Sequence, residues 1–335
     1  MKRWQFWVGL LFSVIFLYIA LNGLNLSEFL GAISTAQYLW VLPGILIYFV
    51  AVWIRAWRWN YLLRPIKPIS ARSTFPITCI GYMGNNIYPA RAGEVLRAIV
   101  MKRKEGVPIS TSLATIIIER IFDGVVMLAF IFFNLSELGK LTGSSGFVGS
   151  IKDIALVGTG VFFGALIIFI FAAMFPKTTS QVSQWLIARL PGQSLRNQVA
   201  KLLEKFLDGL SSLRSPGDVL MIFFTSVLIW LLETVKYWFV MQAFSFHGSV
   251  SFFALMLLNG IANLATTIPS APGYLGTWEA VIKAVLVAYQ VPGSEALGYA
   301  VVLHIALYVP ITVLGAFFMM REGFKWSGAL PSEAV

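Results

Sequence analysis

Residues 84–97 read GNNIYPARAGEVLR, a polar stretch in a chain that is otherwise strongly apolar. Of the 335 residues, 58% are hydrophobic and 12% are charged, whereas a soluble domain carries about 25% charged residues. We therefore predict an all-α, polytopic membrane protein that forms a single integral membrane domain over residues 1–335. In such a protein, proline, arginine and glutamate between apolar segments are unexpected, so their presence in this stretch indicates a specific structural role.

The composition argues against several kinds of site. Cys79 is the only cysteine in the sequence, which excludes an intrachain disulfide and a zinc site built from cysteines. The histidines, His247 and His304, are too few for a histidine-rich metal site, so we predict no metal and no cofactor. The net charge of +10 would suit nucleic acid, but in a membrane protein it reports topology and anionic lipid headgroups. We therefore expect membrane lipids, and no nucleic acid, as partners.

Apolar runs of about 20 residues are long enough to cross a bilayer as helices. The first run follows a basic start, Lys2-Arg3, but it is long for a signal peptide and no Ala-x-Ala cleavage site closes it, so we expect a retained span. The predicted full spans, six in all, are 5–22, 37–59, 111–134, 154–175, 217–246 and 296–320. Two more apolar stretches, 74–90 and 250–290, are interrupted by proline, glycine and asparagine.

The distribution of lysine and arginine predicts the orientation. Basic residues gather at 55–72, 91–104 and 177–214, whereas the loops at 23–36 and 247–249 hold none. Because cytoplasmic loops carry the excess of positive charge, we place the basic segments and both termini in the cytoplasm, with the protein in the plasma membrane.

This orientation has a consequence for both interrupted stretches. Residues 55–72 and 91–104 would lie on the same side, so the stretch 74–90 enters the membrane and returns without crossing it. The stretch 250–290 would do the same from the opposite face. Irregular backbone at such depth is tolerated where it is buried in protein or lines a cavity. We therefore predict two re-entrant broken-helix segments.

The two interrupted stretches also resemble each other. The segments Pro89–Gly93 and Pro269–Gly273 share the spacing Pro-x-x-x-Gly, and a glutamate follows each glycine-bearing turn. Inverted repeats with broken helices in corresponding positions are typical of transporters. We predict such a repeat, with halves 37–134 and 217–320. The alternative is that proline and glycine simply mark loops between helices.

Several ionisable residues fall inside the predicted spans. Glu119 and Asp123 share one helix face, and Arg120 lies three residues before Asp123 and can pair with it. Similar spacings predict the pairs Glu233–Lys236 and Glu279–Lys283. Ionisable groups in a membrane usually face a partner or a wet cavity. These sets therefore favour a polar cavity, and the alternative is a group of structural ion pairs that lock helices together.

Arg91 and Arg97 are candidates for contact with an anionic headgroup. Guanidinium groups bind phosphate through two hydrogen bonds, and a helix N-terminus adds its positive dipole end. Six residues place the two side chains about 240° apart around a helix of about 3.6 residues per turn. We therefore expect Arg91 to be the primary anion contact, and Arg97 to be either an interfacial charge or a charge just behind the site. The alternative is that both are ordinary cytoplasmic charges.

Residues 178–214 differ from the rest of the chain. Apolar residues such as Trp185, Leu195 and Leu202 alternate with lysine and arginine at helical spacing. This pattern predicts amphipathic helices on the cytoplasmic leaflet. A packed pair of cytoplasmic helices is the alternative.

Three stretches carry a resemblance to a known family. NNIYPARAGEVLRA (85–98), ATIIIERIFDG (114–124) and TIPSAPGYLGTWE (267–279) resemble conserved stretches of the lysylphosphatidylglycerol synthase transmembrane region family, whose members are also named flippase-like or UPF0104 membrane proteins. In the bifunctional members, this region is implicated in flipping aminoacylated phosphatidylglycerol, which a separate cytoplasmic domain makes. We expect no synthase domain here, because the chain ends at Val335, shortly after the last predicted span.

The resemblance implies a set of site residues. It implies Pro89, Arg91, Gly93, Glu94, Glu119, Arg120, Asp123, Pro269, Pro272, Gly273, Gly276 and Glu279. The reading of charges and polar residues adds Asn86, Arg97, Glu233, Lys236 and Lys283 to the predicted lipid-headgroup site.

Two functions of different classes follow from these residues. The first is a transporter or flippase for an anionic-headgroup lipid, either an anionic phospholipid or a polyprenyl phosphate. The second is a membrane-embedded glycosyl- or lipid-modifying transferase, because some archaeal relatives carry a glycosyltransferase domain linked to dolichol phosphate. The sequence has no Asp-x-Asp, P-loop or GxGxxG motif, although Glu119 and Asp123 could act as acid and base. A non-catalytic scaffold and a homo-oligomer also stay open.

Overall fold

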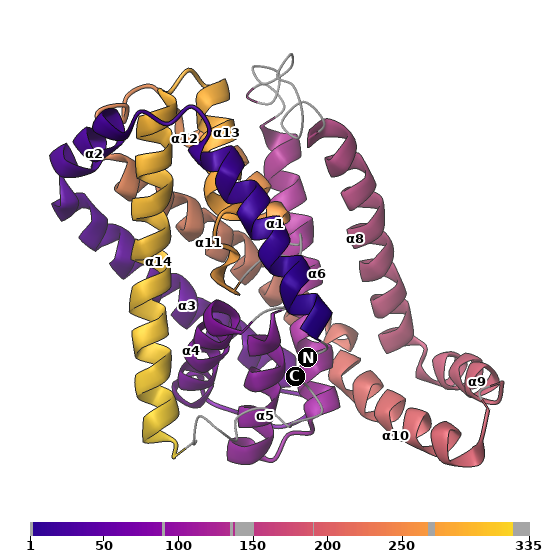
Figure 1. Cartoon of the computed structure of the whole chain (residues 1–335). Helices are drawn as coiled ribbons and strands as arrows, with labels where there is room; N and C mark the ends of the chain where they lie inside the picture. The colour runs from indigo at the N-terminus through magenta and orange to yellow at the C-terminus, as the bar shows by residue number, and fades with distance from the viewer. Residues whose placement is uncertain are drawn as a thin grey trace.

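The computed structural model describes residues 3–88, 91–134, 137, 151–189, 191–266 and 272–323. Every regular element in this part of the chain is helical, as predicted, and it contains no strand. Figure 1 shows the helices. They are α1 (Arg3–Leu21), α2 (Leu26–Thr35), η1 (Tyr38–Trp40), α3 (Val41–Leu63), α4 (Ala71–Ile87), α5 (Ala92–Glu105), α6 (Ile109–Phe133), α8 (Ile151–Met174), α9 (Pro176–Ile187), α10 (Gln193–Gly209), η2 (Leu210–Arg214), α11 (Pro216–Met241), α12 (Phe252–Ala265), η3 (Pro272–Tyr274), α13 (Thr277–Ala288) and α14 (Gly293–Arg321).

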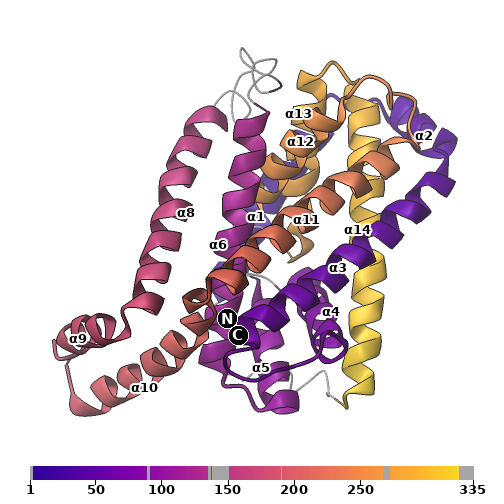
Figure 2. The same cartoon turned by 180° about the vertical axis from the view of Figure 1, so that it is seen from behind.

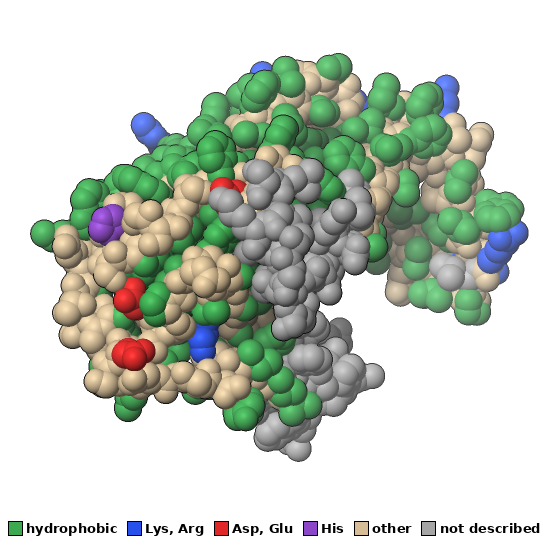
Figure 3. All heavy atoms as spheres, turned by 90° about the horizontal axis from the view of Figure 1, so that it is seen from above, with side chains coloured by type: hydrophobic (Ala, Val, Ile, Leu, Met, Phe, Trp, Pro, Cys, Tyr) green, Lys and Arg blue, Asp and Glu red, His purple; other side chains and the backbone are tan. Residues whose placement is uncertain are grey.

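Three of the described helical segments are long and apolar enough to cross a membrane. They are Tyr38–Leu63, Pro216–Met241 and Gly293–Arg321. Two bent pairs of helices, α1 with α2 and α8 with α9, raise the number to five if each pair forms one span. Seen from above, hydrophobic side chains cover much of the upper edge of the view (Figure 3). The predicted count of six full spans stays a prediction.

The centre of the molecule is a pair of long helices, α3 and α11, which run side by side (Figure 2). Helix α4 packs against α14, and helix α12 packs against α6. The buried apolar side chains form two large clusters, one centred on α11 to α14 and one centred on α3 to α5. Polar groups between these clusters are therefore removed from bulk water.

Helices α4 and α5 leave one end of the molecule and return to it. The Nζ atom of Lys67, just after α3, donates to a carboxylate oxygen of Glu105 at 2.9 Å, and Glu105 is the last residue of α5. Lys104 donates to Glu322, just after α14, at 2.7 Å. The ends of α3, α5 and α14 therefore meet at one end of the molecule.

The segment formed by α12 and α13 starts and finishes at the opposite side of the molecule from that of α4 and α5. The backbone N–H of Gln37, just before α3, donates to the carbonyl oxygen of Ala243, just after α11, at 2.9 Å. The hydroxyl of Ser245 donates to the carboxylate of Glu295, in the first turn of α14, at 2.8 Å. The chain between α11 and α14 thus starts and finishes where α3 begins.

Close backbone contacts explain one glycine in each of the two broken segments, α4–α5 and α12–α13. A Cβ atom on Gly93 would lie 2.0 Å from the carbonyl oxygen of Gly81, so only glycine lets α5 approach α4 this closely. Gly276 has φ 84° at the start of α13, and a Cβ atom there would lie 2.6 Å from the carbonyl oxygen of Ser13. Pro89 and Pro269, which define the predicted spacing, lie outside the described residues.

Helices α8, α9 and α10 extend to one side of the central helices (Figure 2). The α8–α9 pair is bent by 107°. The hydroxyl of Thr111, in α6, donates to the backbone carbonyl of Lys205 at 2.8 Å, which fixes the end of α10 against the start of α6. Trp185 and Leu202 are more than half exposed. The predicted amphipathic helices are therefore present, and their position on the cytoplasmic leaflet stays a prediction.

Candidate functional site

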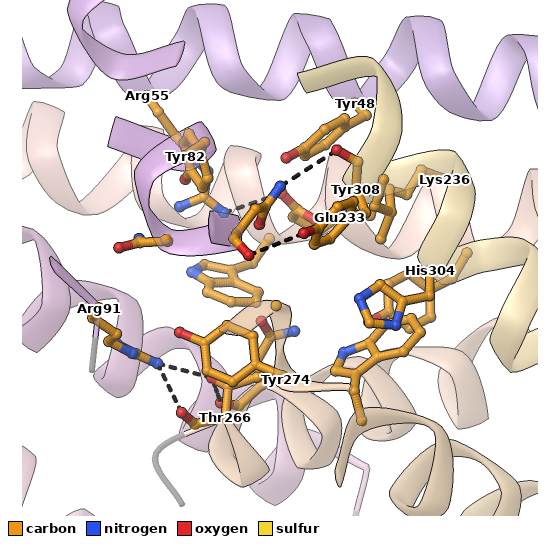
Figure 4. Close-up of a pocket in the computed structure, with 18 of the residues that line it drawn as sticks. Tyr48, Arg55, Tyr82, Arg91, Glu233, Lys236, Thr266, Tyr274, His304 and Tyr308 are labelled. Atoms are coloured by element: carbon orange, nitrogen blue, oxygen red, sulfur yellow. Dashed lines mark hydrogen bonds and ion pairs between the residues drawn. The ribbon is translucent and has the colours of Figure 1, made fainter. Parts of the chain in front are cut away.

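A polar cavity of about 170 Å³ lies between the central helices and the two broken segments (Figure 4). Helices α3, α4, α11 and α14 supply most of its wall, and residues in or next to α5, α6, α12, η3 and α13 complete it. Its lining residues are Tyr48, Arg55, Tyr82, Asn85, Asn86, Arg91, Glu94, Arg120, Trp230, Glu233, Lys236, Tyr237, Asn263, Thr266, Gly273, Tyr274, Trp278, His304, Leu307 and Tyr308.

The charged side chains around this cavity are unbalanced. Four of the lining residues are lysine or arginine, and two are glutamate. The low-dielectric interior of a protein strengthens the electric field of this excess positive charge. The cavity is therefore electrostatically suited to an anion.

Three charged side chains form one wall of the cavity. The Nη2 atom of Arg55 donates to Glu233 at 3.1 Å, and Lys236 forms an ion pair with the same carboxylate, as its i,i+3 spacing predicts. The ammonium of Lys236 lies 4.5 Å from the centre of the Tyr48 ring. Glu233 thus has two cationic partners, which leaves the wall positively charged.

Asp123 lies behind this wall in a group of buried arginines. Arg58 donates to its carboxylate at 2.5 Å and 3.2 Å, and the indole N–H of Trp230 donates at 3.1 Å. The predicted partner, Arg120, is farther away, at 3.7 Å. Arg58 is 0% exposed and Asp123 is 1% exposed, so this carboxylate has a structural role in joining α3, α6 and α11.

The prediction that Arg55 and Arg58 are cytoplasmic charges is wrong. Helix α3 continues to Leu63, so both arginines lie within the helix, one turn apart. Their side chains are buried because they face carboxylates of α6 and α11.

Of the two predicted positions for Arg97, the interfacial one is wrong, and the position behind the site agrees with the structure. Arg97 donates through both terminal nitrogens to Glu119, at 2.6 Å and 3.2 Å, and its guanidinium lies 3.6 Å from the centre of the Trp59 ring. The side chain is buried, and neither Arg97 nor Glu119 lines the cavity. This pair fixes α5 against α6, because a bidentate, stacked arginine is held in one geometry.

Arg91 lies in the cavity wall at the start of α5. Its backbone has φ 54°, a left-handed conformation that is uncommon outside glycine. Its Nη2 atom donates to the hydroxyl of Thr266 at 2.8 Å and lies at 3.5 Å from the Thr266 carbonyl oxygen. Figure 4 shows this contact beside Tyr274. Since Thr266 ends α12, Arg91 joins the two broken segments.

Asn86 connects α4 to α14 at the cavity edge. Its amide nitrogen donates to the hydroxyl of Thr312 at 2.7 Å, and the hydroxyl of Tyr308 donates to its backbone carbonyl at 3.0 Å. These bonds hold the end of α4, whose last turn forms the start of the polar stretch 84–97.

The predicted pair Glu279–Lys283 is not formed. The Glu279 carboxylate accepts from the backbone N–H of Gly276 at 2.8 Å and forms a hydrogen bond with the His304 ring. Lys283 donates to the backbone carbonyls of Ala20 and Asn22, at 2.7 Å and 3.0 Å. The end of α1 lies close enough to Lys283 to offer carbonyl oxygens, so Lys283 holds α1 in place and lies outside the cavity.

The structure thus divides the predicted site residues. Asn86, Arg91, Glu94, Arg120, Glu233, Lys236 and Gly273 line the cavity. Arg97, Glu119 and Asp123 lie behind it, and Gly93, Pro272, Gly276, Glu279 and Lys283 position helices around it.

The cavity also contains residues that the prediction missed. Arg55, Tyr48 and His304 line it, and Arg58 supports it. The predicted span 37–59 already contains Arg55 and Arg58, and ionisable residues inside a span could have indicated both arginines. Among the residues that the structure describes, no group of three or more His, Cys, Asp or Glu side chains is arranged to hold a metal ion.

Comparison with known proteins gives a consistent assignment. The chain matches the family described as lysylphosphatidylglycerol synthase TM region over residues 6–315. It is 27% identical to a UPF0104 membrane protein of Methanothermobacter thermautotrophicus, over 95% of this chain and 93% of that protein. It is 22% identical to a UPF0104 membrane protein of Methanocaldococcus jannaschii, over 93% of both chains.

A further relative bears an enzyme's name. The chain is 27% identical to Glycosyltransferase AglD of Haloferax volcanii, over 92% of this chain and 52% of that protein. It therefore matches about half of this relative. No solved structure matches the chain.

The matched region covers nearly the whole sequence, and the three resembling stretches all fall within it. The helical fold with its candidate spans agrees with this match. The chain is an integral, multi-pass membrane protein and belongs to the lysylphosphatidylglycerol synthase transmembrane region family.

Proposed function

We propose that the protein is a lipid transporter that moves an anionic-headgroup lipid between the leaflets of the membrane. The observation that carries this proposal is the polar cavity, whose lining has four cationic side chains against two carboxylates. Intramembrane charges around a cavity mark substrate pathways, and lysine and arginine recognise phosphate. An anionic phospholipid or a polyprenyl phosphate would place its phosphate there while its chains stay in the bilayer.

The helix packing supports an inverted repeat, with halves 37–134 and 217–320. Each half consists of a long helix, two short helices with a break between them, and another long helix. In one half α4 packs on α14 of the other, and correspondingly α12 packs on α6. Two halves related in this way, with a site between them, can open alternately to either side.

The ends of the helices support a membrane placement. Because α4 and α5 return to the end where α3 finishes, we propose that they form a re-entrant segment, and that α12 and α13 form another from the opposite face. The basic residues at 102–104 would then lie in the cytoplasm, with both termini, and the protein would reside in the plasma membrane.

Cysteine labelling tests this placement. We expect single cysteines at Ser70 and Lys104, in a Cys79→Ala background, to react with an impermeant maleimide only when the cytoplasmic side is opened. A cysteine at Ser34, an exposed position in α2, should react from the outside of intact cells. Labelling of positions 70 and 104 from opposite sides would show that α4 and α5 cross the membrane.

Lipid flux in proteoliposomes tests the function itself. Purified protein in phosphatidylcholine vesicles should expose inner-leaflet fluorescent phosphatidylglycerol to dithionite, with flux several-fold above that of protein-free vesicles. Fluorescent phosphatidylcholine should move more slowly, because its zwitterionic headgroup matches the positive cavity less well. Absence of flux with both fluorescent phosphatidylglycerol and a fluorescent polyprenyl phosphate would contradict the proposal.

The second candidate is a membrane-embedded transferase, which the name of the Haloferax volcanii relative favours. The proposed acid and base, Glu119 and Asp123, are each 1% exposed and paired with Arg97 and Arg58. Carboxylates held in this way are poor proton carriers, which favours transport. Incubation in detergent with a nucleotide sugar and dolichyl phosphate, followed by mass spectrometry of the lipids, would reveal a transferase by its product.

A further inference from the structure

We propose that an apolar groove beside the cavity binds one hydrocarbon chain of the lipid whose headgroup occupies the cavity. This inference rests on the proposed function, because it assigns a place to the rest of the same substrate. The groove lies between α1, the start of α13 and α14, and has a volume of about 620 Å³. Its walls include Val14, Leu17, Leu275, Val301, Ile305 and Val309.

The outer wall of the groove faces the surroundings of the protein. Leu275 and Ile305 are 55% and 56% exposed, and Val14 and Val309 are similarly exposed. In a membrane, apolar side chains exposed along α1 and α14 contact lipid chains. The groove is therefore open laterally to the hydrocarbon of the bilayer.

The inner end of the groove adjoins the polar cavity. His304 and Tyr308 line both spaces, and their rings lie 5.7 Å apart between centres. The hydrogen bond between His304 and Glu279 lies at this junction. A molecule with an apolar chain and a charged end could therefore occupy the groove and the cavity at once.

Specific contacts hold the wall that α1 provides. The close approach of Gly276 to the Ser13 carbonyl leaves no space for a side chain between α1 and α13. At the C-terminal end of α1, the ammonium of Lys283 donates to the carbonyl oxygens of Ala20 and Asn22. Lys283 itself lies outside the groove lining. Since α1 is fixed at two levels, the groove is part of the folded structure.

The residues that line the cavity and the groove together indicate which molecule binds there. The cavity attracts an anion but has a volume of only about 170 Å³, whereas the adjoining groove is lined by aliphatic side chains. A neutral apolar molecule would gain nothing from the cavity, and a free anion would gain nothing from the groove. An anionic lipid satisfies both, with its phosphate near Arg91 and Lys236 and one chain along α14.

Photolabelling with two lipids of matched chains tests the groove. The full chain is reconstituted in phosphatidylcholine vesicles that contain a trace of phosphatidic acid or phosphatidylcholine, each with a diazirine in one acyl chain. We expect phosphatidic acid to label groove residues such as Leu17, Val301 and Ile305 several-fold more than labelled phosphatidylcholine does. Equal labelling by both would identify ordinary boundary lipid and overturn the inference.

Matched substitutions on one helix separate the groove from the general lipid surface. Ile305→Trp narrows the groove and should lower phosphatidic acid labelling of Leu17 several-fold. Val313→Trp is the control, because Val313 is on the same helix, is 64% exposed and does not line the groove. If both variants label Leu17 as the wild type does, the groove does not hold the chain.

A cavity variant links the two spaces and keeps the failure of each proposal distinguishable. Arg91→Gln should reduce the preference for phosphatidic acid in the groove, since one cation of the cavity is removed. Groove labelling without lipid flux would contradict the transport function and support the groove. Lipid flux without selective groove labelling would support the transport function and contradict the groove.

Discussion

Asp123→Asn should strongly destabilise the protein, although the side chain keeps its size. Asp123 accepts hydrogen bonds from Arg58 and Trp230, and Arg55 and Arg120 lie within 3.7 Å of its carboxylate. Removing its charge takes the nearest carboxylate from buried Arg58 and leaves only Glu119, at 4.0 Å, and breaking a buried pair costs about 3–5 kcal/mol. We expect a large fall in apparent melting temperature in detergent and low abundance in the membrane.

A surface carboxylate provides the control for this substitution. Glu322 pairs with Lys104 at 2.7 Å near the end of the molecule, where both side chains are partly exposed. Pairs of this kind contribute about 0–1 kcal/mol, so Glu322→Gln should leave the melting temperature close to that of the wild type. If Asp123→Asn is as stable as Glu322→Gln, the buried arginine cluster does not hold α3, α6 and α11 together.

The positions of the helices could be predicted from the sequence because they depend on local pattern. The predicted span 111–134 corresponds to α6 at Ile109–Phe133, and the predicted span 296–320 corresponds to α14 at Gly293–Arg321. The interrupted stretch 250–290 consists of two short helices with a break, as its proline and glycine residues indicate. The stretch 74–90 covers α4 alone, which continues through Pro76, and α5 begins after it at Ala92. Runs of apolar residues carry this information within a single segment.

The partners of the charged residues could not be predicted in the same way. Arg58 and Asp123 are 65 residues apart, and Arg97 and Glu119 are 22 residues apart, so neither pair appears as an i,i+3 or i,i+4 spacing. Counting arginines as cytoplasmic charges failed for Arg55 because a carboxylate on a distant helix can hold an arginine inside the protein. Only the packing of α3 against α11 reveals this partner.

The buried arginines also alter the basis of the predicted orientation. With Arg55, Arg58 and Arg97 enclosed by protein, they no longer report the side of the membrane. The remaining basic residues, at 64–72 and 102–104, still indicate a cytoplasmic location for the ends of α3 and α5. Because Lys67 and Lys104 both lie where α3, α5 and α14 end, these charges still point to one common side.

Arg91→Lys should impair lipid flux while leaving the protein stable. Lysine keeps the positive charge and is no worse suited than arginine to the left-handed backbone at this position, but it cannot form two parallel hydrogen bonds to a phosphate. A hydrogen bond to a charged group contributes about 1.5–3 kcal/mol, so flux of fluorescent phosphatidylglycerol should fall by about tenfold or more. Flux is measured in vesicles with matched amounts of protein, and stability is measured by melting temperature.

Arg97→Lys is the matched substitution six residues later, and it should have the opposite profile. Arg97 makes a bidentate contact with buried Glu119 and stacks on Trp59, and lysine can reproduce neither geometry. We therefore expect its melting temperature to fall, while the protein that stays folded transports normally, because Arg97 does not line the cavity. Normal flux in Arg91→Lys would show that charge alone suffices at residue 91. A stable Arg97→Lys protein with reduced flux would instead place the headgroup contact at Arg97.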